Sequence, residues 1–147
     1  MTESLPFRLA SPGRDTIDLE GIMSVSYHAD GLLQVSDEGI VLEWRETRTV
    51  DQVSLEKIGT DVDQVAEDYI EVPMSRLAGA WLIGGWWWPR LELRARGFED
   101  FQDVPGARGV TLTLRIQRRD RALARAMAGE IMAGVTAGDP HRQLQAP

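Results

Sequence analysis

The chain has 147 residues, 43% hydrophobic and 27% charged, and this composition predicts one soluble globular domain with a single core. It contains no cysteine, which excludes disulfides and thiolate metal sites. The net charge of −7 argues against nucleic acid as a partner, because phosphate binding needs a basic surface.

The charge is unevenly distributed along the chain. Residues 1–75 hold 16 acids and 5 bases, a net charge of −11, whereas residues 76–147 hold 7 acids and 11 bases, a net charge of +4. Two interpretations stay open: a two-faced molecule with a steering electric field, or two halves that fold into one barrel and intermix their charges.

The N-terminal residues show no clear hydrophobic period, and we expect an N-terminal arm over 1–18, a folded domain over 19–137 and a flexible tail over 138–147. Met1–Ala10 has no basic region followed by an apolar run. We therefore expect no signal peptide and a cytoplasmic location.

The first part of the domain reads as an antiparallel meander. Gly21–Tyr27 alternates apolar and polar residues, as a half-buried strand does. Asp-Gly favours a tight turn, so a turn is predicted at Ala29–Gly31 and a second one at Asp37–Gly39. Between them residues 32–36 continue the alternation, and beyond them Ile40–Arg45 forms the third strand.

The segment Thr60–Asp68 is acidic and polar and is predicted to be a loop. Its carboxylates raise a calcium hypothesis, but an EF-hand loop needs glycine at its sixth position and glutamate at its twelfth. Those positions hold Ala66 and Val72. A solvated acidic loop without metal is therefore the prediction.

The centre of the chain predicts two core strands that meet at a tryptophan-rich turn. A short strand, Tyr69–Val72, ends at Pro73, and Met74 and Ser75 form a bend. The next strand is Leu77–Ile83, with Leu77, Trp81 and Ile83 on one face. After Gly84 and Gly85, Pro89–Arg96 alternates cleanly, with Leu91, Leu93 and Ala95 pointing to the same side.

The end of the chain changes from strand to helix. A loop over Gly97–Gly109 precedes a last strand, Val110–Ile116, and Asp120 is a candidate N-cap. Gly134 and Gly138 are candidate helix stops. The helix carries a narrow apolar stripe suited to lying on a sheet, formed by Leu123, Met127, Ile131 and Val135.

Three local strings resemble small bacterial domains of the pleckstrin-homology-like (PH-like) superfold, including its GRAM-like relatives: Ile70–Leu77, Val104–Ala107 and Leu112–Arg121. The resemblance covers Leu19–Val135. It implies a mainly β fold: a seven-stranded, partly open antiparallel barrel capped by one C-terminal amphipathic helix.

Phosphoinositide-binding members of this superfold use lysines and arginines in and beside the first hairpin. The matching stretch, Tyr27–Leu32, has no lysine or arginine and contains Asp30. A multiply charged head group would be repelled there, so we expect no phosphoinositide binding.

No catalytic, cofactor or metal site is predicted. The two histidines are His28, in a predicted turn, and His141, in the tail, which is unsuited to a base or a zinc site. There is no Gly-x-Ser-x-Gly motif and no glycine-rich phosphate loop. A non-enzymatic protein is the expectation.

The most unusual feature is three consecutive tryptophans, Trp86, Trp87 and Trp88. They either cap the barrel end as part of the core, contact another protein or a second copy of the chain, or enter the membrane headgroup zone. The candidate interaction residues are these three tryptophans and the arginines that follow them, Arg90, Arg94 and Arg96.

The sequence thus predicts a PH-like interaction module that contacts a partner protein or forms a homodimer. The alternatives are a peripheral membrane-binding domain that uses the tryptophans and arginines, and a small-molecule binder that uses the barrel cavity.

Overall fold

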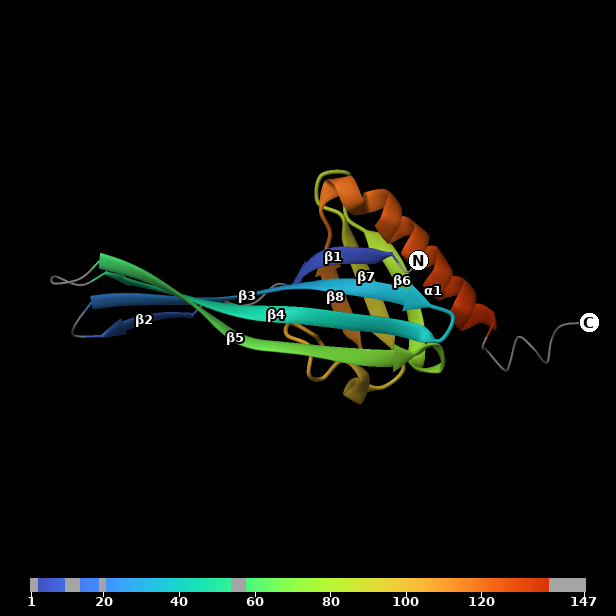
Figure 1. The fold of residues 1–147 in the computed structure, drawn as a ribbon, viewed down its shortest axis with the longest axis horizontal. Coiled ribbons are helices and arrows are strands. Elements are labelled where there is room, and N and C mark those ends of the chain that lie inside the picture. The colour runs from blue at the N-terminus through green and yellow to red at the C-terminus, as the bar shows by residue number, and fades with distance from the viewer. Residues whose placement is uncertain (1–2, 10–13, 19–20, 54–57, 138–147) are drawn as a thin grey trace, which may run out of the picture.

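The computed structural model describes residues 3–9, 14–18, 21–53 and 58–137. The predicted tail, 138–147, therefore lies outside the described residues. Eight strands and one long helix make up this part of the chain (Figure 1). The strands are β1 (Ser4–Leu9), β2 (Arg14–Asp18), β3 (Gly21–Ser36), β4 (Gly39–Val53), β5 (Ile58–Pro73), β6 (Leu77–Ile83), β7 (Arg90–Ala95) and β8 (Thr111–Arg115), and the helix is α1 (Arg121–Ala137).

All the strand pairings are antiparallel, and seven strands follow one another in the order β5-β4-β3-β1-β8-β7-β6. The strand β2 lies off this path and pairs with the first residues of β3. The sheet curls but does not close, because β5 and β6 stand at its two ends. The predicted fold class, a mainly β, seven-stranded open antiparallel sheet with one C-terminal helix, is confirmed.

The core lies on the inner face of this sheet and follows the predicted alternation in the second half of the chain. Leu91, Leu93 and Ala95 of β7 are buried, as are Leu112 and Leu114 of β8. The loop between these strands adds two buried apolar residues, Phe101 and Val104. Alternation works here because each strand has one face on the core and one in solvent.

The N-terminal segment holds a strand that the sequence analysis does not identify. Ser4–Leu9 forms β1, between β3 and β8, and buries Leu5, Phe7 and Leu9. Pro6 obscured this pattern, since proline cannot donate to a strand ladder. It is tolerated because β1 pairs with β8 only at Arg8, so Pro6 has a strand partner on one side alone.

The turn predicted at Ala29–Gly31 is wrong, since β3 runs unbroken from Gly21 to Ser36. A Cβ at Gly31 would lie 2.5 Å from Cζ of Phe7 and 2.1 Å from the Glu43 carbonyl oxygen. The glycine therefore serves close packing of β1, β3 and β4, and the dipeptide Asp-Gly only resembles a turn. The second predicted turn, at Asp37 and Glu38, is confirmed.

The acidic loop predicted at Thr60–Asp68 is also wrong, because these residues belong to β5. They pair with β4 along its length, with Asp63 opposite Arg48. The far parts of β3, β4 and β5, together with β2, form a sheet that projects well beyond the barrel (Figure 1). Cross-strand pairing outweighs the low intrinsic β-propensity of aspartate in this segment.

The strands β6 and β7 form the predicted hairpin, but one face assignment is wrong. The register of β6 against β7 shifts between Leu77 and Gly79. This bulge places Ala80 in the core and turns Trp81 outward, where it is 38% exposed. The expected grouping of Leu77, Trp81 and Ile83 on one face therefore fails.

The helix α1 packs on the sheet with the predicted apolar stripe. Met127 and Ile131 are buried, and Leu123 and Val135 are partly buried against the core. The sulfur of Met132 lies 3.4 Å from the backbone nitrogen of Ala80, so the helix covers the edge strand β6. Gly134 does not stop the helix, which continues to Ala137.

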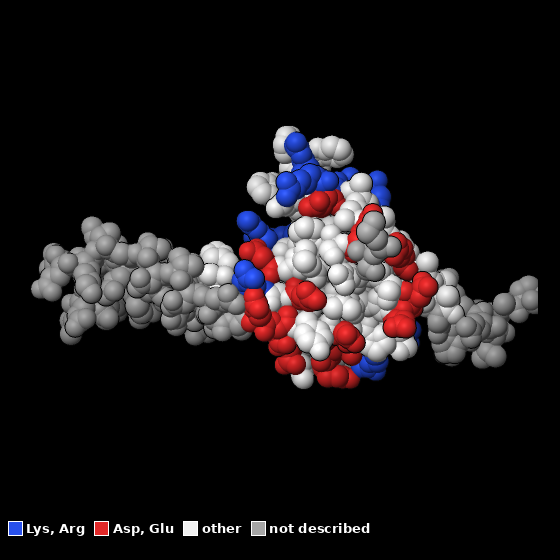
Figure 2. Space-filling model, viewed as in Figure 1, with Lys and Arg blue, Asp and Glu red and all other residues white. Residues whose placement is uncertain are grey.

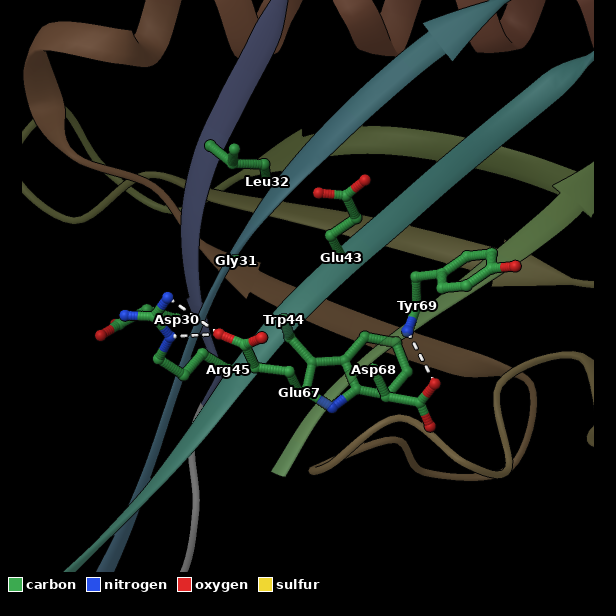
Figure 3. A pocket seen from close by; sticks show the side chains of 9 residues that line it. All are labelled: Asp30, Gly31, Leu32, Glu43, Trp44, Arg45, Glu67, Asp68 and Tyr69. Atoms are coloured by element: carbon green, nitrogen blue, oxygen red, sulfur yellow. Dashed lines mark hydrogen bonds and ion pairs between the residues drawn. The ribbon is translucent and has the colours of Figure 1, made fainter. Parts of the chain in front are cut away.

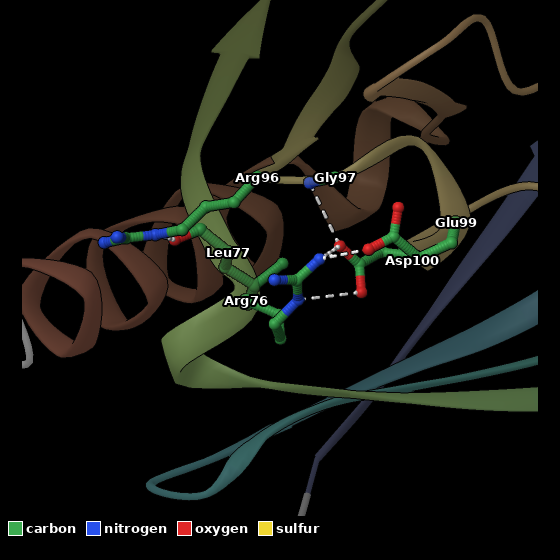
Figure 4. A network of polar contacts seen from close by, with 6 residues as sticks. All are labelled: Arg76, Leu77, Arg96, Gly97, Glu99 and Asp100. Carbon is green, nitrogen blue, oxygen red and sulfur yellow. Dashed lines mark hydrogen bonds and ion pairs between the residues drawn. The ribbon is translucent and has the colours of Figure 1, made fainter.

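A polar network joins the β5–β6 corner to the β7–β8 loop (Figure 4). Arg76 donates to Asp100 at 3.3 and 3.0 Å and to Glu99 at 2.6 Å, and the Gly97 backbone N–H donates to Asp100 at 3.1 Å. The hydrogen bond and the charge of Asp100 raise the pKa of Arg76 above its ordinary value. Arg76 therefore holds the corner as a permanent cation.

We predict that Met127→Asp lowers the free energy of unfolding by about 3–5 kcal/mol, because it buries an unpaired charge between α1 and the sheet. The matched control is Ala126→Asp, at an exposed position of the same helix, which should cost about 1 kcal/mol or less. Thermal and urea unfolding measure both variants. Equal stability of the two would contradict the packing of α1 on the core.

Candidate interaction site

The loop between β6 and β7 presents the three tryptophans to solvent. Gly84 turns the chain with a φ of +84°, and a Cβ there would lie 2.4 Å from the Trp88 carbonyl oxygen. Pro89 is buried and fixes the exit into β7. Trp86, Trp87 and Trp88 are 62%, 69% and 82% exposed. The described chain therefore does not place them in its core.

Two arginines from the segment that begins α1 lie against these rings. The guanidinium of Arg118 is 4.3 Å from the centroid of the Trp87 ring, and that of Arg121 is 5.3 Å from the Trp86 ring. Both distances suit cation–π attraction, which holds the exposed rings in place. We call this end of the molecule, formed by the β6–β7 loop and residues 115–121, the tryptophan end.

A groove with a volume of about 780 Å³ runs along the tryptophan end. Trp87, Trp88 and Pro89 line it on one side. The rest of the lining holds five arginines and no carboxylate: Arg8, Arg90, Arg115, Arg118 and Arg119. Figure 2 shows basic side chains gathered at this end and acidic ones over the lower part of the same face.

Three of the five arginines stand side by side on neighbouring strands. Arg90 of β7 pairs in register with Arg115 of β8, and Arg115 pairs with Arg8 of β1. Like charges directly opposite each other destabilise a sheet. Only Arg8 has a carboxylate nearby among the described residues, Asp30 at 3.4 Å. This arginine row is therefore suited to an anionic group supplied from outside.

The other predicted arginines lie elsewhere. Arg94 stacks on Trp81 at 5.1 Å and pairs with Glu92 at 3.2 Å. Arg96 follows the last residue of β7, at the opposite end of the strand from the tryptophans, and donates to the Leu77 carbonyl oxygen at 3.3 Å. Of the arginines predicted from sequence, only Arg90 lines the groove with the tryptophans.

Sequence reasoning missed the other groove arginines. Arg8 lies in the segment expected to be an arm, Arg115 in the last predicted strand, and Arg118 and Arg119 between that strand and the predicted helix. The density of arginine in residues 115–121 was the one available signal. Only the strand register reveals that Arg8 joins them.

A second, acidic hollow lies at the root of the projecting sheet (Figure 3). Its volume is about 540 Å³, and its lining is Asp30, Gly31, Leu32, Glu43, Trp44, Arg45, Glu67, Asp68 and Tyr69. Arg45 reaches Glu67 at 2.9 Å, and the Asp68 carboxylate accepts from the Tyr69 backbone N–H at 2.8 Å. The sequence analysis does not reveal this surface, because it predicts a loop at Thr60–Asp68 where the structure has part of β5.

His28 lies on β3 and is exposed, not in a turn as predicted. Within the described ranges no three histidine, cysteine or acidic side chains cluster as metal ligands. In the same ranges no helix is long and apolar enough to cross a membrane.

Comparisons with protein-family models, curated proteins and solved structures gave no match to this chain.

The structure predicts a large loss of stability on substitution of one tryptophan and almost none on substitution of another. Trp44 is 5% exposed within the core, so Trp44→Ala should cost about 3–5 kcal/mol of unfolding free energy. Trp88→Ala, at an exposed position, should change it by about 0.5 kcal/mol or less. Urea unfolding of both variants tests this. A large loss for Trp88→Ala would instead make Trp88 part of the structural core.

Proposed function

We propose that this chain is a non-enzymatic, PH-like interaction module that contacts a partner protein through its tryptophan end. The open seven-stranded sheet followed by a single covering helix supports the PH-like assignment. The observation that carries the function is the exposure of three consecutive tryptophans beside a groove of arginines.

The residue types at this end are those that dominate protein–protein binding. Tryptophan and arginine are enriched among hot-spot residues, and tryptophan brings a large rigid contact area. The rings are already oriented by Arg118 and Arg121, so binding orders fewer side chains. An anionic partner surface would also neutralise Arg90 and Arg115.

Capture experiments with the tryptophan end altered test this function. We expect Trp87→Ala/Trp88→Ala to weaken partner binding by about thirtyfold or more, since one hot-spot residue contributes roughly 2 kcal/mol. The control is Phe98→Ala, an exposed aromatic on a different loop. Quantitative capture from an extract of the native cell identifies the partner, and calorimetry with the purified partner measures the change.

Thermal unfolding of the same variants separates binding from folding. Wild-type stability with lost binding supports the proposal. Unchanged binding by Trp87→Ala/Trp88→Ala contradicts it, whichever partner is captured.

A second candidate function is peripheral membrane binding, favoured by the protrusion of Trp86–Trp88 among arginines. Tryptophan prefers the headgroup zone, and each arginine near an anionic surface contributes about 1 kcal/mol. We predict that this function would appear as co-sedimentation with vesicles containing phosphatidylserine, and that Trp87→Ala/Trp88→Ala would abolish it. Equal recovery with and without vesicles would reject this candidate and leave protein binding in place.

A further inference from the structure

We infer that the groove at the tryptophan end binds a free nucleotide, a small ligand that carries phosphate groups and a planar ring. The inference goes beyond the proposed function, because it assigns a small molecule to the groove whichever protein contacts the rings. It follows from three properties of the groove: its unpaired arginines, their number in a small volume, and a free tryptophan ring on one wall.

Most arginines of the groove lack a counter-charge within the described part of the chain. No carboxylate lines the groove. Arg8 pairs with Asp30 at 3.4 Å. The other four arginines of the lining form no ion pair with a described residue: Arg90, Arg115, Arg118 and Arg119. Their positive charges are left for a ligand or for solvent ions to neutralise.

Two of these arginines are placed to bind one phosphate group together. Arg90 of β7 and Arg115 of β8 are partners in the strand register, and both are exposed. Their neighbours Leu91 and Leu114 are buried, so the two arginines project from the outer face of the sheet. Neighbouring strands lie roughly 4.8 Å apart, which brings both guanidinium groups within reach of one phosphate. Arginine binds phosphate through bidentate, charge-assisted hydrogen bonds.

The volume of the groove favours phosphate over carboxylate as the anionic group. It is about 780 Å³, within the range of roughly 300–1,000 Å³ typical of small-molecule sites. A phosphate monoester carries a charge of about −1.5 to −2 at pH 7, whereas a carboxylate carries a single negative charge. Neutralising the four arginines thus takes two phosphate groups or four acidic side chains of a peptide. A compact diphosphate matches the charge and leaves room for a ring.

Trp88 offers a flat surface to the ring of such a ligand. It lines the groove and is 82% exposed. Arginines lie over the rings of Trp86 and Trp87, whereas no cation of the described residues lies over Trp88. Nucleobases stack on exposed aromatic side chains whatever the base, because every base has a π-face. A ligand that joins a base to a diphosphate therefore uses the arginines and the free ring together.

Calorimetry with the purified full chain tests this site with three probes: ADP, which has both parts, pyrophosphate, which lacks the ring, and adenosine, which lacks the phosphates. We expect ADP to bind more tightly than either fragment, because it makes both sets of contacts. Its affinity should fall as salt is added, since ions screen the arginines. Equal binding of ADP and pyrophosphate, or no binding of ADP at millimolar concentration, overturns the inference.

Two variants separate the contributions of the arginines and the ring. Arg90→Gln/Arg115→Gln should weaken both ADP and pyrophosphate by at least about tenfold, because a phosphate group loses two charged donors. Trp88→Ala should weaken ADP by about fivefold or more and leave pyrophosphate binding unchanged. The matched controls, which should bind ADP as the wild type does, change exposed residues that do not line the groove: Arg108→Gln/Arg125→Gln and Trp86→Ala.

Thermal unfolding checks that each variant is folded, and two further probes test the other anions. A polyglutamate peptide and a single-stranded oligothymidylate should both bind more weakly than ADP, because the net charge of −7 repels long polyanions. Tighter binding of either probe overturns the assignment to a free nucleotide. Folded groove variants that bind ADP as the wild type does overturn the site itself.

Failure of this inference is distinguishable from failure of the proposed function. A chain that binds no ADP but still captures a protein through Trp87 and Trp88 rejects the nucleotide site alone. ADP binding by a chain that captures no protein keeps the nucleotide site and rejects the proposed function.

Discussion

The fold depends on the position of β1 between two halves of the sheet. The strands β3–β5 form one antiparallel set and β6–β8 another, and β1 pairs with β3 on one side and β8 on the other. Leu5, Phe7 and Leu9 bury the inner face of β1 in the shared core. Without this strand, each half would expose a free edge and lose part of its core.

The same strand creates the distribution of charge on the surface. The acid-rich first half of the chain supplies the strands around Asp30, Glu43 and Asp68, and the base-rich second half supplies β7, β8 and the approach to α1. Because β1 lies between β3 and β8, the acid-rich and base-rich strands meet at β1, where Arg8 and Asp30 form an ion pair. On the face shown in Figure 2, basic side chains gather at the top and acidic ones over the middle and lower part, with some basic ones among them.

The tryptophan end combines features that are costly in an isolated molecule. Three large rings stay in solvent, and three arginines share one line of the sheet without sufficient counter-charge. In the rest of the described sheet, buried and exposed residues alternate along the strands. Arg76 is paired with Asp100 and Glu99. Local departures of this kind from stable packing are typical of surfaces adapted to bind.

The sequence by itself determined the features that depend on neighbouring residues. The alternation in Pro89–Arg96 and Val110–Ile116 identified two core strands, and the four-residue spacing from Leu123 to Val135 identified the helix and its buried face. Three consecutive bulky side chains beside two glycines also pointed to a tryptophan cluster at a turn. These signals depend on residues that are close together in the sequence, and the tertiary structure preserves the elements that they predict.

Tertiary structure decided the features that depend on register between distant segments. The strand β1 is short and carries Pro6, β3 passes straight through an Asp-Gly pair, and β5 accepts aspartates because β4 lies beside it. The bulge near Gly79 reversed the face of Trp81. The line from Arg90 through Arg8 to Asp30 joins strands far apart in the sequence, and a local pattern holds no information about which residues a fold places opposite each other.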